Sequence, residues 1–437
     1  MQITHTVSHT SPVPPEIHDL PVMNVPPVER ELLPNGVEIV WLNSGHQPVS
    51  RISVVWPIGT ADVDSAETLA LLREMLPEGT PKHSGAEIAG IFEFNGTWTK
   101  VTTGRHFTMF TLYALNKTVE TVWPLMGEII MEPTFPEESL ARLREKSAAA
   151  TELSQRKVKV RSSNLIKQMI FGADSPAARI KSPEILRLVE RDSLIHLHRR
   201  LMLSTPPTIF VAGQLSPSIM QMARRMGESF CFTGLTSMQR TIIPQPEHTG
   251  TSREVDRDTD SMQTAVNIAL PTIGRMHPDY VRLRAAVFAL GGHFGSRLMS
   301  NIREDKGYTY GISASMQPSL EGTDIQISCE NDNRFTAEVL KETFAEIDRL
   351  STEPMPTEEL EVIKRTSVSG MLSMLDSPFS ILDHYIMLKS FNLPDDTFCT
   401  QQQQLRNLSA RDILEAARTY ILPAPRLIAL AGDPDLQ

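Results

Sequence analysis

Hydrophobic and polar residues follow two different periods along this chain, and segments of the two kinds alternate. Segments with the two-residue alternation or the short apolar runs typical of strands are 36–42, 51–56 and 107–115. Segments with apolar residues at helical spacing, which predict amphipathic helices, lie at 68–76 and 117–130. The order strand, helix, strand, helix then returns at 265–270, 281–290, 324–329 and 335–350. This pattern predicts two units of similar construction.

Local sequence matches support an internal repeat of about 220 residues. The segment from Glu132 to Leu140 has a counterpart from Glu353 to Leu360, and in each a proline and a pair of glutamates precede a predicted helix. A second pair of matches joins 206–213 to 423–432, and each ends in glycine. Two independent matches at nearly the same offset indicate one domain that is present twice.

The predicted fold is α+β, with two tandem homologous domains, each a mostly antiparallel sheet with helices packed on one face. No glycine-rich dinucleotide loop follows any predicted strand, which argues against a doubly wound sheet. We expect a proline-rich extended arm at 1–28, an N-terminal domain at 29–238, a linker at 239–253 and a C-terminal domain at 254–437.

Composition excludes several classes of partner. The chain has 437 residues, 42 Lys and Arg against 52 Asp and Glu, and a formal net charge of −10, so neither nucleic acid nor an anionic membrane surface is expected to bind. No apolar stretch reaches the length of a membrane span. Three distant cysteines predict neither a disulfide framework nor a cysteine-based metal site. The first residues lack the features of a secretory signal or presequence, so the expected location is cytoplasmic.

Several motifs occur in an order that resembles the insulinase/pitrilysin family of zinc metallopeptidases, the inverted zincins. They are Leu33-Pro34-Asn35-Gly36, Gly59-Thr60-Ala61-Asp62, Met75-Leu76-Pro77-Glu78-Gly79-Thr80, Phe135-Pro136-Glu137-Glu138, Val211-Ala212-Gly213 and the segment from Leu290 to Tyr310. The likeness covers nearly the whole chain after Glu29. It implies a helix that ends at Gly79-Thr80 and carries the zinc motif H-x-x-E-H.

The zinc ligands that the resemblance calls for are missing. Counting back from Gly79-Thr80 places Ala70 and Glu74 at the two histidines and Arg73 at the catalytic glutamate. The third ligand position falls at Ala149 or Ala150, with Glu152 close by. A methyl group cannot bind zinc, and a guanidinium would repel it and cannot accept a proton from water. We therefore expect no metal on this chain.

The resemblance also implies a substrate-side pair, which this chain keeps. The family's arginine and tyrosine, seven residues apart, match Arg303 and Tyr310, and Gly291, Gly292 and Phe294 form a possible substrate-side loop. A tyrosine hydroxyl can stabilise the oxyanion that forms during peptide hydrolysis, and an arginine can hold peptide carbonyls. The structural alternative is that Arg303 caps a helix or pairs with Asp305, that Tyr310 is a half-buried strand residue, and that the glycines only form turns.

Together these features predict the non-zinc subunit of a two-subunit peptidase that degrades or processes peptides. This type resembles the non-catalytic subunit of two-subunit bacterial members and of the mitochondrial processing peptidase. A homologous partner would carry the zinc, and this chain would contribute Arg303 and Tyr310 in trans. We expect no peptidase activity from the chain alone. The alternative is an inert structural or peptide-binding homologue, which could form a homodimer. A neighbouring reading frame that encodes H-x-x-E-H would favour the first interpretation.

Overall fold

A computed structural model describes residues 22–232 and 237–436 of the chain. Most of the expected arm, 1–28, lies outside this described part. The strands are β1 (Glu29–Leu32), β2 (Glu38–Asn43), β3 (Val49–Trp56), β4 (Trp98–Thr103), β5 (Thr108–Leu115), β6 (Thr208–Gly213), β7 (Thr251–Arg257), β8 (Gln263–Thr272), β9 (Thr309–Pro318), β10 (Thr323–Asp332) and β11 (Arg426–Gly432).

Helices fill the segments between the strands. Those of the first half are α1 (Ala66–Met75), α2 (Gly85–Phe94), α3 (Val119–Met131), α4 (Glu137–Gln155), α5 (Val158–Phe171), α6 (Pro183–Leu188), α7 (Arg191–Leu201) and α8 (Pro217–Ser229). Those of the second half are α9 (Tyr280–Gly291), α10 (Thr336–Thr352), α11 (Thr357–Ser373), α12 (Pro378–Phe391), α13 (Thr397–Arg406) and α14 (Ala410–Tyr420). A π-helical segment, η3 (Met299–Asp305), and short 3₁₀ turns, η1 (Leu76–Glu78), η2 (Pro176–Ala178) and η4 (Asn333–Phe335), complete the set.

The two sheets have the same topology, which confirms the tandem α+β fold. The first sheet has the order β1-β2-β6-β3-β5-β4 and the second the order β7-β11-β8-β10-β9, so the second repeats the first without its edge strand β1. In each sheet the last strand pairs parallel to one neighbour, as β6 does to β2 and β11 to β7, and the other pairings are antiparallel. The prolines of the repeated motif stand directly before α4 and α11, as the sequence predicted.

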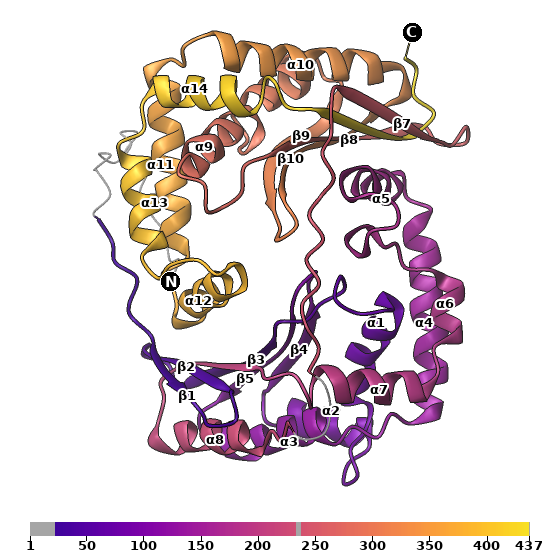
Figure 1. Cartoon of the computed structure of the whole chain (residues 1–437), viewed down its shortest axis with the longest axis vertical. Helices are drawn as coiled ribbons and strands as arrows, with labels where there is room; N and C mark the ends of the chain where they lie inside the picture. Colours follow the sequence, from indigo (N-terminus) through magenta and orange to yellow (C-terminus); the bar gives the residue numbers. More distant parts are fainter. Residues whose placement is uncertain (1–21, 233–236, 437) are drawn as a thin grey trace, which may run out of the picture.

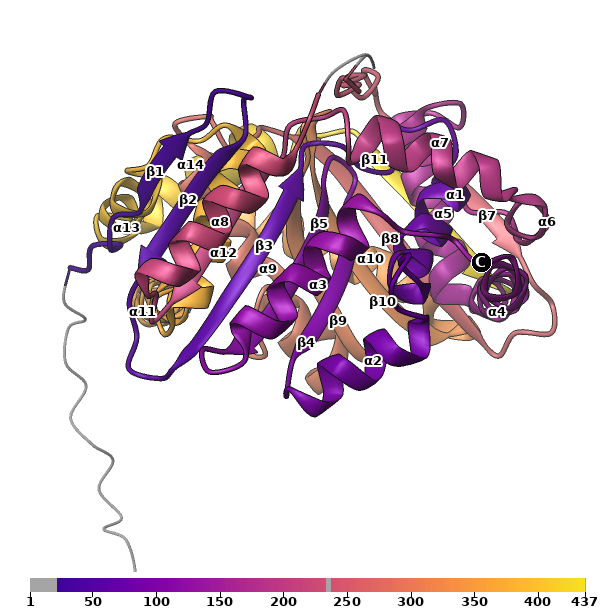
Figure 2. The ribbon, with the colours of Figure 1, turned by 90° about the horizontal axis from the view of Figure 1, so that it is seen from below.

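The main core of each half lies between its sheet and its own helices. Figure 2 shows α8, α3 and α2 across the outer face of the first sheet. Side chains such as Ile52 and Val211 pack there against α3 and α8, while α9, α10 and α14 cover the corresponding face of the second sheet through residues such as Ile268 and Leu430. Successive residues of these strands point to opposite faces of the sheet, and apolar residues occur on both faces. Each sheet therefore also has an apolar inner face.

Each half covers the inner face of the other half's sheet with one helix. Helix α12 packs on β2 and β6, where Leu382 and Leu388 meet Val40 and Phe210. Helix α5, which lies 220 residues earlier in the repeat, packs on β8 and β11 of the second sheet. Figure 1 shows both helices between the two sheets. The layer between the two sheets therefore contains one helix from each half.

No helix within 22–232 and 237–436 has both the length and the apolar character that crossing a bilayer requires.

Candidate functional site

The structure brings three of the five degenerate zinc-motif positions together, while Arg73 and Ala149 do not line the same cavity. Ala70 and Glu74 on α1 face Ala150 on α4 across a small cavity of about 310 Å³. Glu74 accepts a hydrogen bond from the Ser147 hydroxyl at 3.0 Å and forms an ion pair with Arg73 at 3.1 Å. These three positions therefore lie on the facing sides of the two helices.

The side chains at this place do not fit a zinc ion. The first and third ligand positions are methyl groups, and the carboxylate of Glu74 is already bound by a guanidinium and a hydroxyl. Glu152, which the sequence left as a possible ligand, pairs instead with Arg187 at 2.8 Å. Across the described residues, no group of three or more His, Cys, Asp and Glu side chains is placed to hold a metal.

Arg303 and Tyr310 lie side by side at the surface of the second half. Arg303 comes from η3, and Tyr310 is the second residue of the edge strand β9. The guanidinium carbon of Arg303 lies 4.6 Å from the ring centre of Phe294 and 5.6 Å from that of Tyr310, distances typical of cation–π contacts. Tyr310 is 93% exposed, so it is not the half-buried strand residue of the structural alternative. The three side chains form an exposed cluster that we call the Arg–Tyr cluster.

The glycines before this cluster have packing roles. A Cβ atom on Gly291 would lie 2.5 Å from the backbone nitrogen of Ala314 in β9, and one on Gly292 would lie 2.4 Å from the Phe288 ring. Helix α9 thus ends close against β9, which only glycine permits there. These contacts explain Gly291 and Gly292 without a substrate, and Phe294 is the exposed large side chain of the loop.

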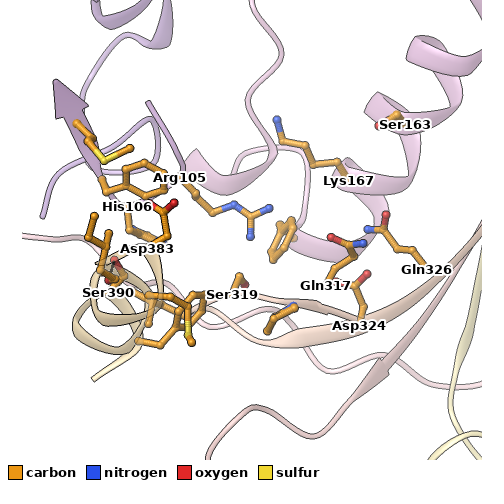
Figure 3. Close-up of a pocket in the computed structure, with 18 of the residues that line it drawn as sticks. Arg105, His106, Ser163, Lys167, Gln317, Ser319, Asp324, Gln326, Asp383 and Ser390 are labelled. Carbon is orange, nitrogen blue, oxygen red and sulfur yellow. Dashed lines mark hydrogen bonds between the residues drawn. The ribbon is translucent and has the colours of Figure 1, made fainter. Parts of the chain in front are cut away.

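A larger cavity of about 630 Å³ lies between the two halves, and the Arg–Tyr cluster is not part of it. Figure 3 shows its lining. Four segments contribute: the start of β5 with the turn before it, helix α5, the hairpin of β9 and β10, and helix α12. Helices α5 and α12, each of which packs on the other half's sheet, thus both line the cavity.

A buried charged cluster closes one end of this cavity. His106 follows β4, and its Nε2 lies 2.7 Å from Oε1 of Glu321 in the hairpin between β9 and β10. Its Nδ1 lies 3.2 Å from Asp62, and Arg105 lies 3.4 Å from the second oxygen of Glu321. Burial alone would lower the pKa of His106, but the hydrogen bonds to Asp62 and Glu321 outweigh it and raise the pKa to about 9. Burial raises the pKa of Glu321, yet its hydrogen bonds to His106 and to the backbone, together with the charges of His106 and Arg105, outweigh burial and bring the pKa to about 2.

Sequence reasoning missed both the cavity and the His106 cluster. Asp62 was noticed only as part of a family motif, and His106 and Glu321 are more than 200 residues apart with no pattern that links them. One signal was available: the turn of 104–107 and the hairpin tip of 319–322 occupy equivalent places in the two repeats. Equivalent loops of two packed repeats can meet on the axis that relates them.

Two protein-family models match successive parts of the chain. Residues 40–174 match the family model described as insulinase (peptidase family M16), and residues 189–367 match the model described as the peptidase M16 inactive domain. Together the two matches cover well over half of the chain.

Relatives and solved structures give the same assignment. An uncharacterized zinc protease, YmxG, of Bacillus subtilis is 24% identical over 80% of this chain and 85% of its own length. A non-peptidase homolog, YmxG, of Helicobacter pylori is 23% identical over 55% of this chain and 56% of its own length. A peptidase M16 inactive domain from Pseudomonas fluorescens has the same fold, with a TM-score of 0.85, 22% identity and coverage of 94% of this chain and 99% of that one. The repeat, the sheet order and the family matches agree: this chain belongs to the insulinase family, peptidase family M16, as a member with a degenerate zinc motif.

Proposed function

We propose that this chain is the non-zinc subunit of a two-subunit zinc metallopeptidase that degrades or processes peptides. A homologous partner would bear the zinc, and the Arg–Tyr cluster of this chain would contact the substrate at the partner's site. The combination that carries the proposal is a zinc position without ligands in a chain that keeps an exposed, preassembled Arg–Tyr cluster.

The surroundings of the cluster support a role in trans. A hydroxyl on a 93% exposed ring does not stabilise the fold, and Arg303 is held in place by two rings rather than by a carboxylate. The cluster lies outside the cavity between the two halves, so a substrate that reaches Tyr310 has to lie against the outer surface of this chain. A homologous subunit facing this surface would enclose such a substrate.

The length of a structural relative is consistent with this pairing. The periplasmic protease PqqL from Escherichia coli has a TM-score of 0.77 to this chain at 13% identity, and this chain covers 48% of it. The PqqL chain is thus about twice as long as the part that this chain matches. We extend the proposal to the cytoplasm as the compartment, because the three cysteines, Cys231, Cys329 and Cys399, are all free thiols.

At the reacting carbonyl, Tyr310 would donate a hydrogen bond from its hydroxyl to the oxygen that gains negative charge. Arg303 would orient neighbouring peptide carbonyls through its planar set of donors, and its stacking on Phe294 limits its freedom before substrate arrives. Neither side chain can activate water, so the isolated chain should hydrolyse no peptide.

The test is reconstitution with a homologue that carries H-x-x-E-H, sought first in a neighbouring reading frame. Tyr310→Phe should lower the turnover of the pair by about 10²-fold, because it removes one oxyanion donor. Tyr308→Phe is the matched control, because the Tyr308 ring stacks on Phe335 at 4.8 Å between ring centres. Loss of the Tyr308 hydroxyl should leave turnover within about twofold of the wild-type pair. Equal turnover of the two variants would refute the role of Tyr310. Stoichiometric zinc in the purified chain alone would refute the division of labour.

A peptide-binding subunit without a catalytic role is the second candidate. Strand β4 is an edge of the first sheet, and Trp98 at its start and Phe94 just before it are exposed. An edge strand can bind an extended peptide through main-chain hydrogen bonds. Peptide binding that survives in the Tyr310→Phe pair, without any turnover by the wild-type pair, would favour this candidate, including as a homodimer.

A further inference from the structure

The cavity between the two halves contains a buried carboxylate that is only partly paired: it is hydrogen-bonded to the side chain of Gln326, and one of its oxygens has no partner in the described part of the chain. Asp324 lies on β10 and is only 2% exposed, and its Oδ2 is buried without a hydrogen-bond partner among the described residues. Leaving a charged acceptor unpaired in a buried place is costly. Burial raises the pKa of Asp324 to about 6, so at neutral pH it is still mostly ionised. A ligand that brings a hydrogen-bonding cation would relieve this cost.

Two cationic side chains besides His106, those of Arg105 and Lys167, lie in the same cavity. Figure 3 shows Arg105 reaching in from one side, while Gln317, Gln326 and Asp324 are grouped on the other. The guanidinium of Arg105 lies 4.4 Å from the ring centre of Phe171, and its ion pair with Glu321 engages it at only 3.4 Å. Lys167, on α5, donates to the carbonyl of Arg179. Burial and the nearby Arg105 lower the pKa of Lys167 to about 8. An anionic group between these cations would stabilise both.

The apolar part of the lining comes mostly from α12 and the start of β5, while His106, Ser163, Ser319, Asp383 and Ser390 add further polar groups. Phe107 and Met109 of the first half and Ile386, Met387 and Phe391 of α12 form this apolar part of the lining. A volume of about 630 Å³ lies in the range of sites that bind small organic molecules, and a few polar groups among apolar walls are typical of such sites. The space is several times larger than one amino-acid side chain requires.

We infer that this cavity binds a short apolar peptide of two or three residues with both termini free. Its ammonium group pairs with Asp324, its carboxylate with Arg105 and Lys167, and its side chains with the apolar wall of α12. The charge pattern distinguishes this ligand from a fatty acid, which has no ammonium, and from an amine, which has no carboxylate. This site is separate from the Arg–Tyr cluster and does not depend on a zinc-bearing partner.

The test measures binding to the full chain, without a partner, by calorimetry and by the rise in melting temperature. The probes are trileucine, N-acetyl-trileucine, trileucine amide and leucine. Trileucine should bind, and each blocked peptide should bind at least about tenfold more weakly because one buried charge then stays unpaired. Leucine should also bind at least about tenfold more weakly, since it fills only part of the space. Equal affinity for all four probes, or no binding of any, would overturn the inference.

Two variants connect each terminus to its residue. Asp324→Asn should bind trileucine at least about tenfold more weakly and N-acetyl-trileucine as the wild type does, whereas Lys167→Met should lose the preference for trileucine over its amide. Asp348→Asn, at an exposed site on α10, is the matched control and should bind like the wild type. If Asp324→Asn fails to fold, Lys167→Met with the blocked peptides still decides the question, and an unchanged preference there would contradict the assignment. Because no partner is present, this outcome is independent of the turnover test for Tyr310.

Discussion

Glu321 connects the two halves of the chain at the tip of the hairpin between β9 and β10, and Glu321→Gln tests how much this contact contributes to stability. The wild-type carboxylate accepts a hydrogen bond from His106 at 2.7 Å and one from Arg105 at 3.4 Å. The side chains of Glu321 and His106 are 1% and 9% exposed. The variant keeps the shape of the side chain but leaves the imidazolium with only one carboxylate, that of Asp62.

The magnitude follows from the pKa of His106. A rise from 6.5 to about 9 corresponds to about 3 kcal/mol of preference for the imidazolium, because a tenfold change in an acid constant is worth about 1.4 kcal/mol. Asp62 and Glu321 share this effect, and residual solvent reduces it. We therefore expect Glu321→Gln to lower the free energy of unfolding by about 2 kcal/mol at pH 6.

The effect should depend on pH in a defined direction. The pKa of His106 is higher in the folded chain, so its contribution is complete below about pH 6.5 and is lost as the pH rises through about 9. The pKa of Glu321 is lower in the folded chain, so its contribution is present above about pH 4.5 and is lost as the pH falls through about 2. The difference between wild type and variant should be largest between about pH 4.5 and 6.5 and should shrink toward pH 9.

Urea unfolding at a series of pH values measures this difference. Glu330→Gln on the same hairpin is the control, since its partner Lys159 is exposed and 3.8 Å away, and it should cost less than about 1 kcal/mol. Equal losses for the two variants at pH 6, or a difference that grows toward pH 9, would refute the reasoning.

Three further substitutions test the packing of the first half and its contact with α12. Gly213→Ala should destabilise the chain by at least about 3 kcal/mol, because Gly213 has a φ of +131° and a Cβ there would lie 2.1 Å from the carbonyl oxygen of Val49. The control is Gly90→Ala on the open surface of α2, which should be neutral or stabilising by up to about 1 kcal/mol. Differential scanning calorimetry checks both, and a harmless Gly213→Ala would contradict the close approach. Asp383→Ala should lower the free energy of unfolding, measured with urea, by about 2–3 kcal/mol, because it leaves the 3% exposed side chain of Arg51 without its ion pair at 2.6 Å. A decrease below about 0.5 kcal/mol would show that other groups balance this buried charge.

The sequence was sufficient to predict the repeat, the α+β fold and several of the strands. These features depend on local patterns: the alternation in 51–56 and the prolines before α4 and α11. Each can be recognised without knowledge of distant contacts, because side-chain period is a property of short segments.

The sequence was not sufficient to predict how the halves meet. Nothing in the sequences of α5 and α12 shows that each helix packs on the other half's sheet. Asp324 looks like one polar residue of an alternating strand, although the structure buries it in a cavity. The proposed roles of Arg303 and Tyr310 stay predictions, because the structure places the pair without a partner or substrate.

The reciprocal packing of α5 and α12 has a consequence for how the chain can be divided. A chain cut between the halves would give two fragments, each with an apolar sheet face that only the missing fragment can cover and a helix with no surface to bind. Such fragments should associate with each other or form swapped dimers of themselves. In this respect the protein resembles a domain-swapped dimer whose two homologous subunits are joined by a linker. An assembly of two such chains would therefore contain four copies of the repeated domain.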